Sequence, residues 1–93
     1  MVWFTIDGVV EDEQDLFSEA TPERVTLSDF LTKYNMVCLK DANGFTSEIF
    51  LDENLPRFLH EMRVSKPEEL IGREAIVYFS NDSKEAYAIC APQ

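Results

Sequence analysis

The chain has 93 residues, of which 45% are hydrophobic, and its 18 acidic against 8 basic residues give a formal net charge of −10. This length predicts one domain, residues 1–93, and the apolar fraction predicts a folded chain instead of a disordered acidic tail. The negative charge disfavours direct binding to nucleic acid or to an anionic membrane, and no apolar run approaches the ~20 residues that a membrane-spanning helix needs.

The chain begins with a predicted hairpin. Residues 2–6 alternate between apolar and polar side chains as a half-buried strand does, Asp7-Gly8 is a strong turn signal, and Val9-Val10 provides the returning strand. Residues 11–20 form either the start of a helix or an acidic loop, and their periodicity does not decide between the two. Thr21-Pro22 ends whichever of these precedes it.

Two helices are predicted from apolar residues that recur at i, i+3, i+4 and i+7. The first spans 26–34, with Thr26 as its N-cap and with one apolar face formed by Leu27, Phe30, Leu31 and Tyr34. The second spans 54–64, with Asn54 as its cap and Pro56 in its first turn. Its buried stripe consists of Leu55, Phe58, Leu59 and Met62.

Two further hairpins are predicted from apolar runs on either side of turn residues. Residues 36–40 and 45–51 flank Asp41-Ala42-Asn43-Gly44, and residues 74–79 and 85–91 flank the turn at 81–84. The run 75–79 is apolar on both faces, which favours a central strand. The predicted fold is therefore α+β, a mainly antiparallel sheet of about five strands with two amphipathic helices on one face.

The start of the chain resembles a β-grasp domain. Phe4-Thr5-Ile6-Asp7-Gly8, followed by Val25-Thr26-Leu27-Ser28-Asp29-Phe30-Leu31, is similar to the strand, turn and T-L-x-x-F-L helix of sulfur carriers, ubiquitin-like proteins and plant-type ferredoxins. The resemblance covers about the first third of the chain and implies a β-grasp-like fold. It implies no shared function, because the chain ends Ala91-Pro92-Gln93 without a Gly-Gly tail, and two cysteines cannot hold an iron–sulfur cluster.

Motifs of enzymatic or metal chemistry are absent from the sequence. It contains no P-loop, G-x-G-x-x-G, G-x-S-x-G or H-E-x-x-H. The single histidine, His60, is expected on the solvated side of the second helix, and Cys38 and Cys90 are expected as reduced, packed thiols. The acidic run 7–19 lacks the alternating ligands and central glycine of a calcium loop. No enzymatic activity, cofactor or metal is expected.

Negative charge is concentrated near the amino terminus. Residues 1–23 contain seven carboxylates and no Lys or Arg, whereas residues 24–93 hold eleven carboxylates and eight basic residues. Such a run is usually a solvated face that serves solubility. However, concentrated charge also destabilises a compact fold through self-repulsion, which favours a role in recognition.

The sharper hypothesis is a non-enzymatic acidic binding or inhibitor protein that occupies a basic, nucleic-acid-binding surface of a partner by imitating phosphates. Small acidic proteins from phages and other mobile elements often act in this way, as inhibitors of restriction or CRISPR systems, and nuclease immunity proteins are similar in size and charge. The carboxylates expected to bind the partner are Asp7, Glu11, Asp12, Glu13, Asp15 and Glu19. Trp3 and Phe50 are out of phase with the apolar residues of their strands, so they are expected as anchors on an open sheet face.

Alternatives to this hypothesis stay open. The chain is otherwise a structural or adaptor module, or a toxin-immunity protein, whose acids serve solubility alone. A second helix, or a homodimer formed through an open sheet face or edge, would then cover Trp3 and Phe50. A cytoplasmic location is expected, because residues 1–7 lack the basic start and long apolar stretch of a signal peptide.

Overall fold

The computed structural model describes residues 2–5, 7–11, 20–80 and 85–92. Within these ranges the chain is α+β but mostly β, with seven strands and one α-helix. The strands are β1 (Trp3–Thr5), β2 (Gly8–Val10), β3 (Ala20–Leu31), β4 (Met36–Lys40), β5 (Thr46–Phe50), β6 (Glu74–Ser80) and β7 (Ala86–Cys90). The helix is α1 (Leu55–Glu61), and the 3₁₀ turns are η1 (Thr32–Tyr34), η2 (Asp52–Asn54) and η3 (Pro67–Leu70).

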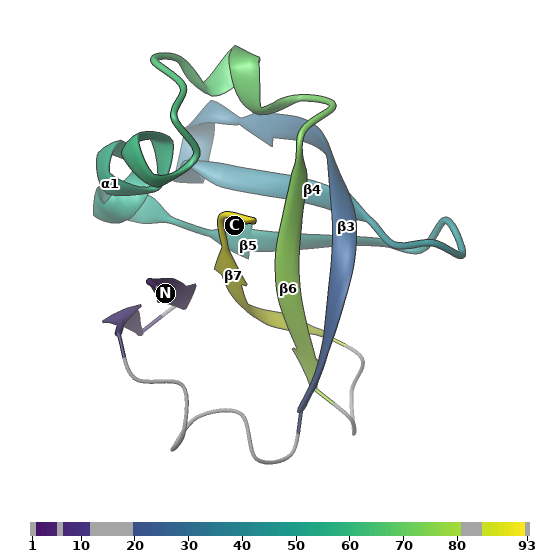
Figure 1. Cartoon of the computed structure of the whole chain (residues 1–93). Helices are drawn as coiled ribbons and strands as arrows, with labels where there is room; N and C mark the ends of the chain where they lie inside the picture. The colour runs from purple at the N-terminus through teal and green to yellow at the C-terminus, as the bar shows by residue number, and fades with distance from the viewer. Residues whose placement is uncertain (1, 6, 12–19, 81–84, 93) are drawn as a thin grey trace.

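The strands form one antiparallel sheet in the order β2-β1-β7-β6-β3-β4-β5. The three predicted hairpins are confirmed as the pairs β1–β2, β4–β5 and β6–β7, and β6 lies at the centre as predicted. The sheet is strongly curled, with β3 and β6 side by side in front and β4 and β5 crossing behind them (Figure 1). Through this curl β5, at one end of the order, comes into contact with β7.

The predicted first helix is wrong, because residues 20–31 form the long strand β3. Its first half pairs with β6 and its second half with β4, and the register shifts between Leu27 and Asp29. Ser28 is the extra residue of this β-bulge, and a bulge bends a strand and changes the phase of its side chains. Leu27 and Phe30 therefore both face the core at a spacing of three, which imitates one turn of a helix.

The predicted second helix is confirmed in part. A 3₁₀ turn over Asp52–Asn54 leads directly into α1, and Pro56 occupies its first turn as expected. The stripe also faces as predicted, because Phe58 and Met62 are buried whereas His60 is exposed. None of the helices in the described ranges combines the length and apolar character needed to cross a bilayer.

The main core lies between the concave inner face of the sheet and α1. Phe4 and Phe58 meet edge-on inside it, with ring centroids 5.2 Å apart, and side chains from six strands surround them. A second, smaller cluster lies on the outer face of β1, β6 and β7. It contains Trp3, Ala88 and Cys90 together with the partly buried Ile76 and Tyr78.

The β-grasp resemblance does not extend to the described structure. Its T-L-x-x-F-L segment, residues 26–31, is the second half of β3 and not a helix. The sheet has seven strands where about five were predicted, and one α-helix where two were predicted. The segment was predicted as a helix but is a strand, and its apolar side chains lie on both faces of the sheet.

Candidate protein-binding surface

The outer face of β3, β4 and β5 presents three rows of side chains that differ in character. The register places Leu31, Met36 and Phe50 in the first row, which is apolar. Asp29, Cys38 and Glu48 form the second row, and Thr26, Lys40 and Thr46 form the third. Residues paired across an antiparallel sheet share a face, so each row is one continuous strip of surface.

The apolar row is the centre of an aromatic cluster, defined here as Leu31, Tyr34, Met36 and Phe50. Tyr34 meets Phe50 edge-on with ring centroids 5.8 Å apart. Leu31 is 42% exposed and Tyr34 49% exposed, so solvent covers much of this apolar surface. Met36, which pairs with Leu31 and Phe50 in the register, is buried but belongs to neither core cluster.

Tyr34 is held in place by the backbone that follows it. Asn35 closes η1 in the left-handed conformation, with φ 47° and ψ 51°, which asparagine tolerates better than most residues. Its side-chain amide donates to the carbonyl oxygen of Asp52 at 2.8 Å, and its own carbonyl oxygen accepts the N–H of Leu51 at 3.0 Å. These bonds tie η1 to the residues after β5, so the two rings of the cluster belong to a braced unit.

Three exposed carboxylates lie near the aromatic cluster, and we call Asp29, Glu48 and Asp52 the acidic rim. Asp29 and Glu48 flank Cys38 in the second row. Burial raises the pKa of the Cys38 thiol, and the negative charges of Glu48 and Asp29 raise it further. The part of the shift that comes from the two carboxylates reflects their negative charge beside the thiol. One cation lies close by, Lys33, whose ammonium is 5.2 Å from the centre of the Tyr34 ring.

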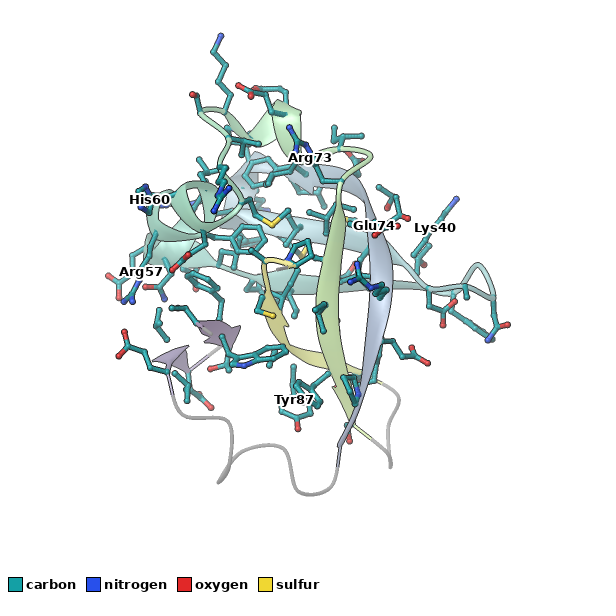
Figure 2. All side chains as sticks on the ribbon, viewed as in Figure 1. Lys40, Arg57, His60, Arg73, Glu74 and Tyr87 are labelled. Carbon is teal, nitrogen blue, oxygen red and sulfur yellow. The ribbon has the colours of Figure 1, made fainter. Side chains whose placement is uncertain are left out.

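The predicted carboxylates are placed only in part. Asp7 is exposed beside the first turn, and Glu11 pairs with Arg57 of α1 at 2.9 Å, a contact between two exposed groups. Figure 2 shows Arg57 on the side of α1 toward the N-terminal strands, and its partner Glu11 directly follows β2. Asp12, Glu13, Asp15 and Glu19 lie outside the described residues. The described part of the predicted acidic face is therefore small and is partly neutralised at Glu11.

The two predicted aromatic anchors have different environments. Trp3 and Phe50 both lie on the outer face, as their phase indicates. Trp3 is only 1% exposed, in contact with Tyr78 at 4.7 Å between ring centroids, so it is a core residue of the smaller cluster. Phe50 is half-buried within the aromatic cluster.

Sequence reasoning missed Leu31, Tyr34 and Asp29 as surface residues. The helical pattern assigned the first two to a buried stripe, which the bulge at Ser28 makes false. A usable signal was present in Val25-Thr26-Leu27, where apolar and polar residues alternate with period two. With that alternation continued past one extra residue, Leu31 moves to the outer face.

A concave region, separate from the aromatic cluster, lies between the end of α1, the start of β6 and the C-terminal residues. It has a volume of about 870 Å³, and His60, Arg63 and Arg73 contribute to its lining. Figure 2 shows His60 and Arg73 on separate elements. The carboxylates of Glu61 and Glu74 line the same region, so its charge is nearly balanced. No group of residues in the described ranges could hold a metal ion.

The chain matches no protein-family model, no curated protein and no solved structure. A fold would not define a function in any case, because unrelated functions share folds. The aromatic cluster and its acidic rim are therefore the features of this chain that bear on its function.

Proposed function

We propose that the protein is a non-enzymatic binding protein that occupies a basic, nucleic-acid-handling surface of a partner protein in the cytoplasm. The single observation that carries the proposal is the exposed aromatic cluster with its acidic rim. Apolar residues surrounded by charged ones are the usual anatomy of a protein interface, in which aromatic side chains anchor and polar side chains exclude water.

The aromatic cluster supports binding rather than simple solubility. Leu31 and Tyr34 are exposed beside Phe50 as one contiguous apolar patch, which is typical of an interaction site. Tyrosine is enriched among residues that dominate binding energy, since its ring is rigid and its hydroxyl stays hydrated until the partner arrives. The brace formed by Asn35 and Asp52 reduces the motion that binding would otherwise have to freeze out.

The charge of the molecule supports a basic partner. The net charge is −10, and only two ion pairs, Arg24–Glu74 and Arg57–Glu11, join residues of the described ranges. Both pairs are exposed and contribute little to stability. A net negative charge accelerates the encounter with a positively charged surface. Large positively charged surfaces are typical of proteins that bind nucleic acids.

The experiment that tests the proposal is capture from native lysate followed by competition. Wild-type protein is immobilised beside Tyr34→Ala and beside the triple variant Asp29→Asn/Glu48→Gln/Asp52→Asn, after circular dichroism has shown that all three are folded. A protein retained by the wild type and lost from Tyr34→Ala is then purified, and its retention by the triple variant is recorded. Its Kd for the wild-type protein is measured with and without duplex DNA.

The expected result is a partner whose binding weakens with added salt and is competed by the duplex. A partner that responds to Tyr34→Ala but not to the triple variant or to DNA would contradict the proposal. That outcome would identify an adaptor whose acids serve solubility.

A further inference from the structure

The strand β5 ends the sheet order, and one of its two edges has no backbone partner among the described residues. The hydrogen bonds between β4 and β5 show which backbone N–H and C=O groups of β5 point to this open edge. Asp41 donates its N–H to the carbonyl of Phe45, and Leu51 donates to the carbonyl of Asn35. Hydrogen-bonded pairs alternate along an antiparallel ladder, so Ser47 and Ile49 bond to β4. The N–H and C=O groups of Thr46, Glu48 and Phe50 therefore point to the open edge.

A groove of about 490 Å³ runs along this edge, between β5 and the residues around the start of β7. Glu48 and Phe50 line it from β5, and Glu85 and Tyr87 line it from the other side. Figure 2 shows Tyr87 at the end of the sheet remote from Arg73. Ile49 and Ala86, which belong to or pack against the main core, also line it. The groove thus combines an open strand edge with an aromatic ring and a carboxylate on each side.

The lining indicates the charge of the occupant. Neither Lys nor Arg occurs among the described residues that line the groove, whereas Glu48 and Glu85 do. The other concave region contains two arginines and would discriminate less. A segment with lysine or arginine side chains would place positive charge between the two carboxylates of the groove.

A second copy of the chain is the occupant that the edge disfavours. β5 is short, and symmetric antiparallel pairing of two β5 edges about its centre would set Glu48 opposite Glu48. Like charges directly opposite each other destabilise a strand pair, and a charged residue at an edge is a common protection against self-association. The same glutamate would attract a basic strand.

We infer that the groove binds an extended, basic segment of the partner, which adds to the sheet as a strand beside β5. The segment accepts and donates backbone hydrogen bonds at Thr46, Glu48 and Phe50, and its basic side chains face Glu48 and Glu85. This inference rests on the proposed function, because it states how part of the same partner is held. Phe50 belongs to both surfaces, so the segment would enter beside the aromatic cluster.

The test uses a defined probe, a short synthetic peptide of alternating lysine and valine, added to the ¹⁵N-labelled full chain. Amide hydrogen exchange is followed residue by residue. The expected result is new protection at Thr46, Glu48 and Phe50, with no gain at Ser47 and Ile49, whose amides already bond to β4. The same peptide with alternate backbone nitrogens methylated keeps its charge but loses its donors, and it should bind at least about tenfold more weakly.

Two variants separate charge from backbone pairing. Glu48→Gln removes the carboxylate alone, whereas Glu48→Pro also removes the outward N–H, a change that edge strands tolerate. The proline variant should bind the unmodified peptide more weakly than the glutamine variant does, with an unchanged melting temperature. Equal binding of the methylated and unmethylated peptides, or uniform protection along β5, would overturn the inference whether or not the proline variant folds.

Other outcomes distinguish this inference from the proposed function. If Tyr34→Ala and Asp29→Asn weaken the captured partner while peptide methylation changes nothing, strand addition fails and the proposed function stands. If the free protein is a dimer whose Thr46, Glu48 and Phe50 amides are already protected, a second copy fills the edge and the inference is wrong.

Discussion

The ring of Tyr34 meets the ring of Phe50 edge-on at 5.8 Å, although the two residues come from a 3₁₀ turn and from a strand. The contact joins η1 to the open edge strand of the sheet. It therefore makes one surface out of segments that neither hairpin prediction nor helix prediction places together.

The aromatic cluster should carry most of the binding energy. Tyr34→Ala is expected to weaken partner binding at least about tenfold, because it removes the exposed half of the ring pair. The cost in folding stability should stay within about 1.5 kcal/mol, the upper range for an aromatic pair. Calorimetric titration with the captured partner measures the first effect and urea denaturation the second.

Phe45 provides the matched control for this substitution. It is 73% exposed on the β4–β5 turn and does not belong to the aromatic cluster. Phe45→Ala should leave the Kd unchanged. An equal loss in both variants would mean that exposed aromatic area in general, and not this cluster, drives binding.

The acidic rim should set the salt dependence of association. Asp29→Asn/Glu48→Gln/Asp52→Asn is expected to lower the association rate and to flatten its decline with ionic strength, because steering by charge is screened by salt. The asparagine at position 52 suits its positive φ of 48°. Stopped-flow mixing at several salt concentrations measures the slope.

A control variant that loses the same number of charges elsewhere shows whether the position of the carboxylates or the net charge sets the salt dependence of association. Neutralising Glu23, Glu68 and Glu69, which are exposed on the first half of β3 and on η3, removes three charges outside the acidic rim. If this variant flattens the slope as much as the rim variant does, net charge alone governs the encounter.

The thiol of Cys38 should report the potential of the outer face. Burial raises the pKa of the Cys38 thiol, and Glu48 and Asp29 raise it further because they oppose the thiolate. The thiol should therefore react more slowly with iodoacetamide than an unperturbed cysteine does. Glu48→Gln should lower the pKa and speed the reaction, since the thiolate is the reactive form.

The rate of this reaction, followed against pH by mass spectrometry of the intact chain, gives the pKa directly. Cys90 is 1% exposed and should stay unmodified under the same conditions, which makes it an internal control. A rate that does not change in Glu48→Gln would remove the support that the thiol gives to the acidic rim.

The contact between Phe4 and Phe58 should dominate the stability that α1 provides. Phe58 is fully buried, so Phe58→Ala leaves a cavity under the helix and is expected to cost about 3–5 kcal/mol. His60→Ala, on the exposed side of the same helix, should change stability by less than about 0.5 kcal/mol. Urea denaturation of both variants compares them, and a similar loss in each would place the helix outside the core.

The hairpins, the central position of β6 and the stripe of α1 were predictable from the sequence, because each depends on short-range periodicity and turn residues. The strand β3 was not, since its bulge at Ser28 spaces Leu27 and Phe30 like residues of a helix. Because β3 was predicted as a helix, two of the four residues of the aromatic cluster were not predicted as surface residues. Phe50 was found because a regular strand keeps its phase, whereas Leu31 and Tyr34 follow the irregular point.

Burial was the other quantity that periodicity could not supply. Trp3 has the phase of an outer-face residue, yet it is enclosed by its neighbours. Whether a face is open depends on the curl of the whole sheet, which no local pattern encodes.

A single strand, β3, is shared by both halves of the curled sheet, with β6 along its first part and β4 along its second. If either half lost its backbone hydrogen bonds to β3, part of this shared strand would be exposed to water. The molecule should consequently melt as one cooperative unit, and tension applied to either hairpin should be transmitted through a single continuous backbone to the opposite side.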